Sequence, residues 1–131
     1  MSANSTGILR AFADLVWNQG DFGRGEALFA AGFQHHDLVT HHDTDLHGYF
    51  ESIREQRRAF PDVCFSIDDV VADDDRVATR WTVTGSHAES DRHVTVSGMS
   101  IDVLTAGRIV ENWTVWDRLG LLEQLGRTDP R

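Results

Sequence analysis

The chain has 131 residues, 40% hydrophobic and 25% charged, which fits one domain over residues 1–131 and excludes a wholly disordered chain. Its formal net charge of −9 argues against nucleic acid and acidic membrane surfaces as partners, because polyanions repel it. A single cysteine, Cys64, excludes an intramolecular disulfide. No signal-peptide pattern and no apolar run of the ~20 residues that span a bilayer are present, so the default expectation is a cytoplasmic protein.

The first half of the chain has helical periodicity. Three helices are expected, over about residues 8–16, 24–31 and 45–59. Ser5 or Thr6 is placed to cap the first helix, and Gly32 is placed to end the second. Pro61 disfavours continuation of the third helix. The stretch between the second and third helices, residues 33–44, is expected to be a loop.

After Pro61 apolar and polar residues alternate, and this period of two predicts β-strands. The expected strands begin at 63, before an acidic turn at 73–75, and continue at 77–87, 93–104 and 109–117, followed by a short helix at 119–125. Residues 105–108 carry a hairpin signal. Helices followed by an antiparallel meander predict an α+β fold, whose twisted sheet curls into a cone around a small-molecule pocket.

The segment from Glu111 to Asp117 carries the first candidate for chemistry. Trp113, Val115 and Asp117 are two residues apart and share one strand face. A carboxylate among apolar side chains loses hydration, which favours a role as general acid or base on the pocket wall. The alternative is that Asp117 ends the strand and caps the helix that begins at 118 or 119. Spacing alone leaves both interpretations open.

Five histidines lie close together across the expected loop and the start of the third helix: His35, His36, His41, His42 and His47. Their spacing matches no compact metal-ligand motif, so we expect hydrogen-bonded or solvated side chains and no metal. His36 is the member that we expect at the pocket mouth.

On the strand that follows the acidic turn, Trp81 and His87 share the face expected to line the pocket. His87 is a candidate donor to a substrate oxygen, or else a surface histidine at a strand end. Arg80 falls on the opposite face and is expected at the surface or in a dimer interface. The chain has no Gly-rich phosphate loop, dinucleotide fingerprint or GxSxG elbow, which leaves cofactor-free catalysis or simple binding.

Five short segments, taken together, resemble the SnoaL-like polyketide cyclase family, within the NTF2-like superfold. They read WNQGD at 17–21, AFPDV at 59–63, DRVATRWT then GSH at 75–87, GRIVENW then Asp at 107–117, and LLEQLG at 121–126. The resemblance implies a cone of three N-terminal helices packed on a curved antiparallel sheet. It also implies a homodimer or homotetramer without metal or organic cofactor. The implied activity is intramolecular aldol ring closure of a hydrophobic polycyclic or polyketide-derived carbonyl compound.

Within this resemblance Asp117 is the acid/base and His87 polarises a substrate oxygen. The expected substrate-binding side chains are Trp17, Trp81, Trp113 and His36. Val115 departs from the family, because anthracycline-type cyclases place a histidine there. The loop at 88–93 is shorter and more polar than the family's, so the sequence leaves the substrate open.

Three alternatives to cyclisation remain: hydroxylation of a related polycyclic compound, isomerisation, or ligand binding without catalysis. A ketosteroid-isomerase-like site needs a second acid and a tyrosine, and no such pair is evident around Tyr49, the only tyrosine. The non-catalytic alternative predicts that backbone N–H groups of the last helix satisfy Asp117.

Overall fold

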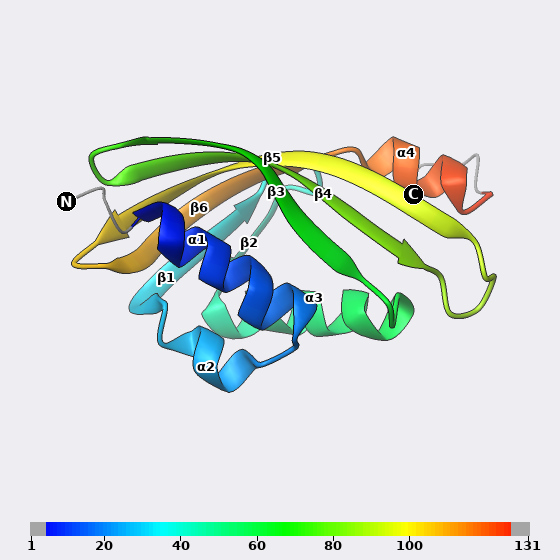
Figure 1. Ribbon diagram of the computed structural model, residues 1–131, viewed down its shortest axis with the longest axis horizontal. Coiled ribbons are helices and arrows are strands. Elements are labelled where there is room, and N and C mark those ends of the chain that lie inside the picture. The colour runs from blue at the N-terminus through cyan, green and yellow to red at the C-terminus, as the bar shows by residue number, and fades with distance from the viewer. Residues whose placement is uncertain (1–4, 127–131) are drawn as a thin grey trace.

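The structure is a computed structural model that describes residues 5–126. Its elements in chain order are α1 (Ser5–Phe12), the π-helical segment η2 (Ala13–Asn18), α2 (Phe22–Glu26), β1 (Phe29–Asp37), β2 (His42–Asp45), α3 (Leu46–Ala59), β3 (Cys64–Asp73), β4 (Arg76–Ser86), β5 (His93–Thr105), β6 (Arg108–Trp116) and α4 (Arg118–Gln124). Helices α1, α2 and α3 lie on one side of a long curved sheet, and α4 lies near its far end (Figure 1). The predicted α+β fold with three N-terminal helices is thus confirmed, with α4 as a fourth helix. None of the described helices is both long and apolar enough to cross a membrane.

The six strands form one sheet in the order β2-β1-β6-β5-β4-β3. Every neighbouring pair is antiparallel except β1 and β6, which run parallel. Strands β3 to β6 occupy the four segments in which alternation predicted strands. The parallel pair brings the N-terminal half of the chain into register with its last strand.

Strands β1 and β2 correct the sequence analysis, which expected a helix through residue 31 and then a loop. Helix α2 ends at Glu26, and Asp21 caps it by accepting a hydrogen bond from the backbone N–H of Arg24 at 3.1 Å. The chain then enters β1, whose Phe29 and Phe33 are buried in the core. Strand β1 was not predicted because its two alanines and its run of polar residues lack the period-two alternation by which strands were recognised.

The main core lies between the helices and the concave face of the sheet. Its centre is aromatic: the Phe29 ring packs edge-on against Phe12, Phe33 and Phe50, with ring centroids 4.8–5.6 Å apart. Tyr49 stacks on Phe12 at 5.9 Å. Such pairs add ~1 kcal/mol each beyond the area that they bury. Phe12 and Tyr49 of this cluster also line a cavity between the helices and the sheet, so the core forms part of the pocket wall.

Candidate functional site

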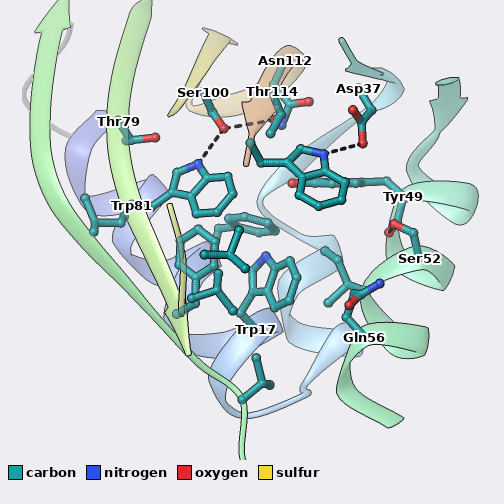
Figure 2. Close-up of a pocket in the computed structure, with 18 of the residues that line it drawn as sticks. Trp17, Asp37, Tyr49, Ser52, Gln56, Thr79, Trp81, Ser100, Asn112 and Thr114 are labelled. Carbon is teal, nitrogen blue, oxygen red and sulfur yellow. Dashed lines mark hydrogen bonds between the residues drawn. The ribbon is translucent and has the colours of Figure 1, made fainter. Parts of the chain in front are cut away.

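A cavity of about 210 Å³ lies between the concave face of the sheet and helices η2 and α3. This exceeds the ~150 Å³ of a cavity that holds benzene, so a molecule of more than one ring fits. Trp17 and Trp81, two of the predicted substrate-binding residues, line the cavity and stack on either side of Phe65 at 5.3 and 5.2 Å. Ser100, Asn112, Thr114 and Asp37 lie at the opposite end from Trp17, whereas Ser52 and Gln56 follow α3 along the side (Figure 2).

Strands β1, β6 and β5 place the polar groups in rows, because residues in register lie side by side across a sheet. We name three rows: the amide row of His35, Asn112 and Asp102, the hydroxyl row of Asp37, Thr114 and Ser100, and the tryptophan row of Trp116, Gly98 and Trp81. All of these residues except Gly98 line the cavity. The pocket wall therefore changes from polar to aromatic along the strands.

In the amide row Asn112 bridges two titratable groups. Its Nδ2 donates to Asp102 Oδ2 at 3.0 Å, and its Oδ1 lies 2.7 Å from His35 Nδ1. An amide NH2 group only donates and an amide oxygen only accepts, so Asp102 is the acceptor and His35 is the donor in these two hydrogen bonds. His35 must then donate through Nδ1–H, which leaves the lone pair on Nε2.

Burial governs ionisation in this row. It raises the pKa of Asp102 to about 7, against the opposing effect of the Asn112 hydrogen bond. Burial also lowers the pKa of His35, again partly offset by Asn112. The Tyr49 ring stacks on the His35 ring at 4.0 Å, and burial raises the pKa of its phenol, which stays protonated. Near neutral pH the row thus holds a neutral imidazole and a carboxyl group able to gain or lose a proton.

In the hydroxyl row Asp37 is held by three N–H donors. Trp116 Nε1 donates to Oδ2 at 3.0 Å, and the backbone N–H groups of Val39 and Thr40 donate to Oδ1 at 2.9 and 3.1 Å. These donors fix the carboxylate at the end of β1.

On the far side of this row, Ser100 Oγ and Thr114 Oγ1 lie 3.0 Å apart. Trp81 Nε1 donates to Ser100 Oγ at 3.0 Å, as Figure 2 shows.

The tryptophan row depends on Gly98. A Cβ added there would fall inside the indole ring of Trp81, far within van der Waals contact. The missing side chain lets the indole lie across β5 and reach Ser100. Gly98 therefore shapes the pocket, although it is not among the residues that line it.

The structure corrects the expected face of β6. Trp113, Val115 and Asp117 do share a face, but it is the outer one, and Asn112, Thr114 and Trp116 line the cavity instead. The sequence analysis expected Trp113 and Val115 to face inward because they are the more apolar side chains of this strand. The wall of the cavity is polar here, so the two faces of β6 are the reverse of that expectation.

Asp117 lies outside the cavity lining. It is exposed and precedes α4, and its Oδ1 accepts a hydrogen bond from the Gly120 backbone N–H at 2.9 Å. This is the cap geometry that the sequence left open as the alternative.

His36 also faces outward, on a strand rather than in the expected loop. Its Nδ1 and Nε2 lie 2.7 Å from Asp43 Oδ1 and Glu111 Oε2, and its ring stacks on Trp113 at 5.3 Å. These two hydrogen bonds raise the pKa of His36. His36 and Trp113 are thus neighbours, but neither lines the cavity.

His87 follows the end of β4 and is not among the residues that line the cavity. Its Nδ1 lies 2.9 Å from Ser90 Oγ, and its ring packs on Phe60, which does line the cavity, at 5.4 Å. Within residues 5–126, no three or more His, Cys, Asp or Glu side chains are grouped so as to hold a metal ion.

The polar residues of the pocket were missed from sequence. The structure brings Asp37, Asp102 and Tyr49 to one cavity, which supplies the two acids and a tyrosine that the sequence did not reveal. A signal existed on β5: Val94, Val96 and Leu104 are buried at alternate positions, and Asp102 interrupts that inward series. A carboxylate at an inward position of a strand is a site candidate.

The curved open sheet, the helices on its concave side and the pocket between them define an NTF2-like protein. The sequence pattern of the SnoaL-like polyketide cyclase family matches residues 7–125, and the chain belongs to that family. No functionally curated protein matches the sequence.

Solved structures share the fold. IdmH, a proposed polyketide cyclase from Streptomyces antibioticus, is 25% identical with a TM-score of 0.85, covering 92% of this chain and 97% of that one. A proposed polyketide cyclase from Acidithiobacillus ferrooxidans is 28% identical with a TM-score of 0.80, covering 98% and 99%. AclR, a proposed hydroxylase from Streptomyces galilaeus, is 22% identical with a TM-score of 0.86, covering 96% and 83%, and its likeness shows the fold alone.

Proposed function

We propose that the chain binds a small hydrophobic carbonyl compound in the pocket and catalyses proton transfer at the carbon next to the carbonyl group. The observation that carries this proposal is Asp102. It is 2% exposed, it belongs to the pocket wall, and burial raises its pKa to about 7. A group with a pKa near the working pH serves both as base and as acid.

The reaction that we propose is an intramolecular aldol ring closure. The Asp102 carboxylate removes a proton from the carbon next to one carbonyl group, which leaves an enolate. The enolate carbon forms a bond with a second carbonyl carbon of the same molecule. Asp102 then returns the proton to the resulting alkoxide oxygen. These reaction steps are redox-neutral and keep every substrate atom in the product, so this chemistry needs no cofactor.

Asp117 and His87 remain predictions for catalysis, taken from the family resemblance. Asp102 is the better candidate on geometry, because Asp117 is exposed and caps α4 whereas Asp102 faces the cavity.

Isomerisation is the second candidate function. It is favoured by Asp37, because its carboxylate lines the same cavity one row away from Asp102 and so places a second acidic side chain beside a bound ligand.

We further propose that the protein is a cytoplasmic homodimer, in which the outer face of the sheet meets a second copy. Met99, Ile101 and Val115 are 44–53% exposed on adjacent strands of that face, and such apolar patches often mark interfaces. Sedimentation of the wild type and of Ile101→Glu tests this. A dimer that dissociates in the variant is expected, and a monomeric wild type would contradict it.

Proton transfer can be tested without the natural substrate by following exchange of the α-protons of 1-tetralone in D₂O by NMR. We expect the wild-type protein to accelerate exchange and Asp102→Asn to reduce the acceleration at least ~100-fold. Asp117→Asn keeps the cap and should retain exchange. Loss of exchange in Asp117→Asn alone would transfer the role to Asp117. Binding of 1-tetralone without any acceleration would favour the non-catalytic alternative.

A further inference from the structure

The Ser100–Thr114 pair of hydroxyls has one hydrogen-bond donor more than its protein partners use. An indole N–H only donates, so Ser100 Oγ accepts from Trp81 Nε1 at 3.0 Å. The two hydroxyls share one further hydrogen bond at 3.0 Å, in which either oxygen can be the donor. Whichever direction that bond takes, one of the two O–H groups is used and the other is left over.

The remaining O–H group is on the cavity wall. Within residues 5–126 these two bonds account for the side-chain hydrogen bonds of both hydroxyls, and both residues line the cavity. The indole N–H polarises Ser100, and hydrogen bonds in a chain strengthen one another. The pair thus offers a strengthened donor in a largely apolar pocket.

The neighbouring groups show which ligand atom this donor suits. Asp37, in the same row, is an acceptor and already receives three N–H donors. Asp102 follows Ser100 by two residues on the same face of β5, so their Cα atoms are separated by ~7 Å. A ligand whose carbonyl oxygen is bound at the hydroxyls therefore lies only one strand repeat from Asp102.

We propose that Ser100 and Thr114 form the subsite that binds the carbonyl oxygen of the ligand and stabilises the negative charge that develops there when the α-proton leaves. This inference rests on the proposed function, since it assigns the oxygen-binding part of the same site. The preferred ligands are ketones attached to fused aromatic or alicyclic rings. Preorganised donors aimed at a developing oxyanion are a large source of catalysis.

The test uses prodan, a naphthalene ketone whose fluorescence shifts to longer wavelength when its carbonyl accepts a hydrogen bond. The matched ligand is its analogue with a propyl group in place of the propionyl group, which lacks the oxygen. The matched variants are Ser100→Ala and Thr114→Val, which each remove one hydroxyl from a different strand. Thr114→Ser keeps the hydroxyl, and Thr82→Val makes the same change outside the cavity lining.

We expect Ser100→Ala and Thr114→Val each to weaken prodan binding by about three- to tenfold and to shift its emission to shorter wavelength. The propyl analogue should bind wild type and both variants alike, and Thr114→Ser and Thr82→Val should behave as wild type with both ligands. Circular dichroism confirms folding, and the analogue confirms an intact pocket.

Equal loss of affinity for both ligands, or unchanged prodan affinity and emission, would overturn the subsite. Neither result would touch the proposed proton transfer, which tetralone exchange measures separately. If the subsite holds and wild type shows no exchange, the proposed function fails alone. If wild type binds neither prodan nor its analogue, the subsite is overturned as well.

Discussion

His35 and His36 are consecutive residues of β1, yet they face opposite sides of the sheet and ionise in opposite directions. His35 is 7% exposed, and burial lowers its pKa. His36 lies between two carboxylates on the outer face, and they raise its pKa. The protonation state of these two histidines therefore depends on the face of the strand on which each lies, and not on residue type alone.

The same contrast runs along β6. On the inner face Trp116 donates to Asp37, and Asn112 bridges His35 and Asp102, so the polar atoms meet inside a cavity. On the outer face Trp113 packs on a histidine whose charge partners are exposed to water. Inner contacts are buried and coupled, whereas outer contacts are screened. Substitutions on the inner face should consequently have larger effects.

The largest effect on stability is expected from Asp102→Asn, and it should depend on pH. The folded-state pKa of about 7 lies above the ordinary 3.8, so the contribution of this group is fully present below pH ~4 and is lost as pH rises through 7. Asparagine avoids that loss. The variant should be more stable than wild type at pH 8 by up to ~4 kcal/mol, and the difference should vanish near pH 4. Urea unfolding at both values tests this, and an equal difference at both would refute it.

Asn112→Ala should cost about 3 kcal/mol, because it leaves His35 and Asp102 buried without their shared partner. Glu111→Ala, one residue away on the outer face, removes only a partly exposed partner of His36 and should cost under ~1 kcal/mol. Chemical denaturation of the two variants makes the comparison. Similar costs would mean that the amide row is not a coupled network.

Gly98→Ala should cost about 2 kcal/mol, since the new methyl group must displace the indole of Trp81. Gly32→Ala is the matched control: nothing lies within 4 Å of a Cβ there, so its effect should stay within ~0.5 kcal/mol. Near-ultraviolet circular dichroism should change only for Gly98→Ala. An unchanged aromatic spectrum would show that the indole does not need the glycine.

Asp117→Ala should cost about 1 kcal/mol through loss of the α4 cap, whereas Asp117→Asn should be nearly neutral, because asparagine caps as well as aspartate. Thermal unfolding of both variants provides the measurement. A large loss of stability in Asp117→Asn would mean that the negative charge, and not the cap, matters for the fold.

The smallest effect on stability is expected from His36→Asn, and its dependence on pH distinguishes His36 from His35. The raised pKa of His36 gives a stabilisation that is fully present below 6.5 and is lost as pH rises through the folded-state value, so His36→Asn should cost under ~1 kcal/mol and only at lower pH. The pH dependence of stability that His35 contributes has the opposite sign. Its pKa is lowered in the folded state, so the fold loses stability as pH falls below 6.5. Unfolding of His36→Asn at pH 5.5 and 8.5 is decisive, with a larger cost at 8.5 contradicting the assignment.

Sequence reasoning reached the parts of the fold in which hydrophobic patterning is strong. Alternation located β3 to β6 and placed Trp81 on the inner face, and helical spacing located α1 and α3. It failed for β1 and β2. Strand β1 carries polar side chains on both faces where His35 and Asp37 line the polar end of the pocket, and all four residues of β2 are polar. Patterning assumes that the inside of a protein is apolar, and a binding site is where that assumption is weakest.

Strand β6 shows the same failure in one element. Its outer residues Trp113 and Val115 are more apolar than its inner residues Asn112 and Thr114, so hydrophobicity indicated the wrong side. The family resemblance predicted the fold correctly, but it indicated Asp117 as the acid/base and not Asp102. Only the register between β5, β6 and β1 brings Asp102 and His35 to one amide, and no local pattern encodes that register.

The parallel pairing of β1 with β6 also has a consequence for how the protein is made. His35 and Asn112 are 77 residues apart in sequence. During synthesis the N-terminal helices and β1 emerge long before β6, and distant contacts form slowly because a long loop must close first. The amide row therefore cannot exist until the final strand has left the ribosome. A ligand that requires this row binds only chains in which β6 has paired with β1, which makes its binding a direct reporter of that pairing.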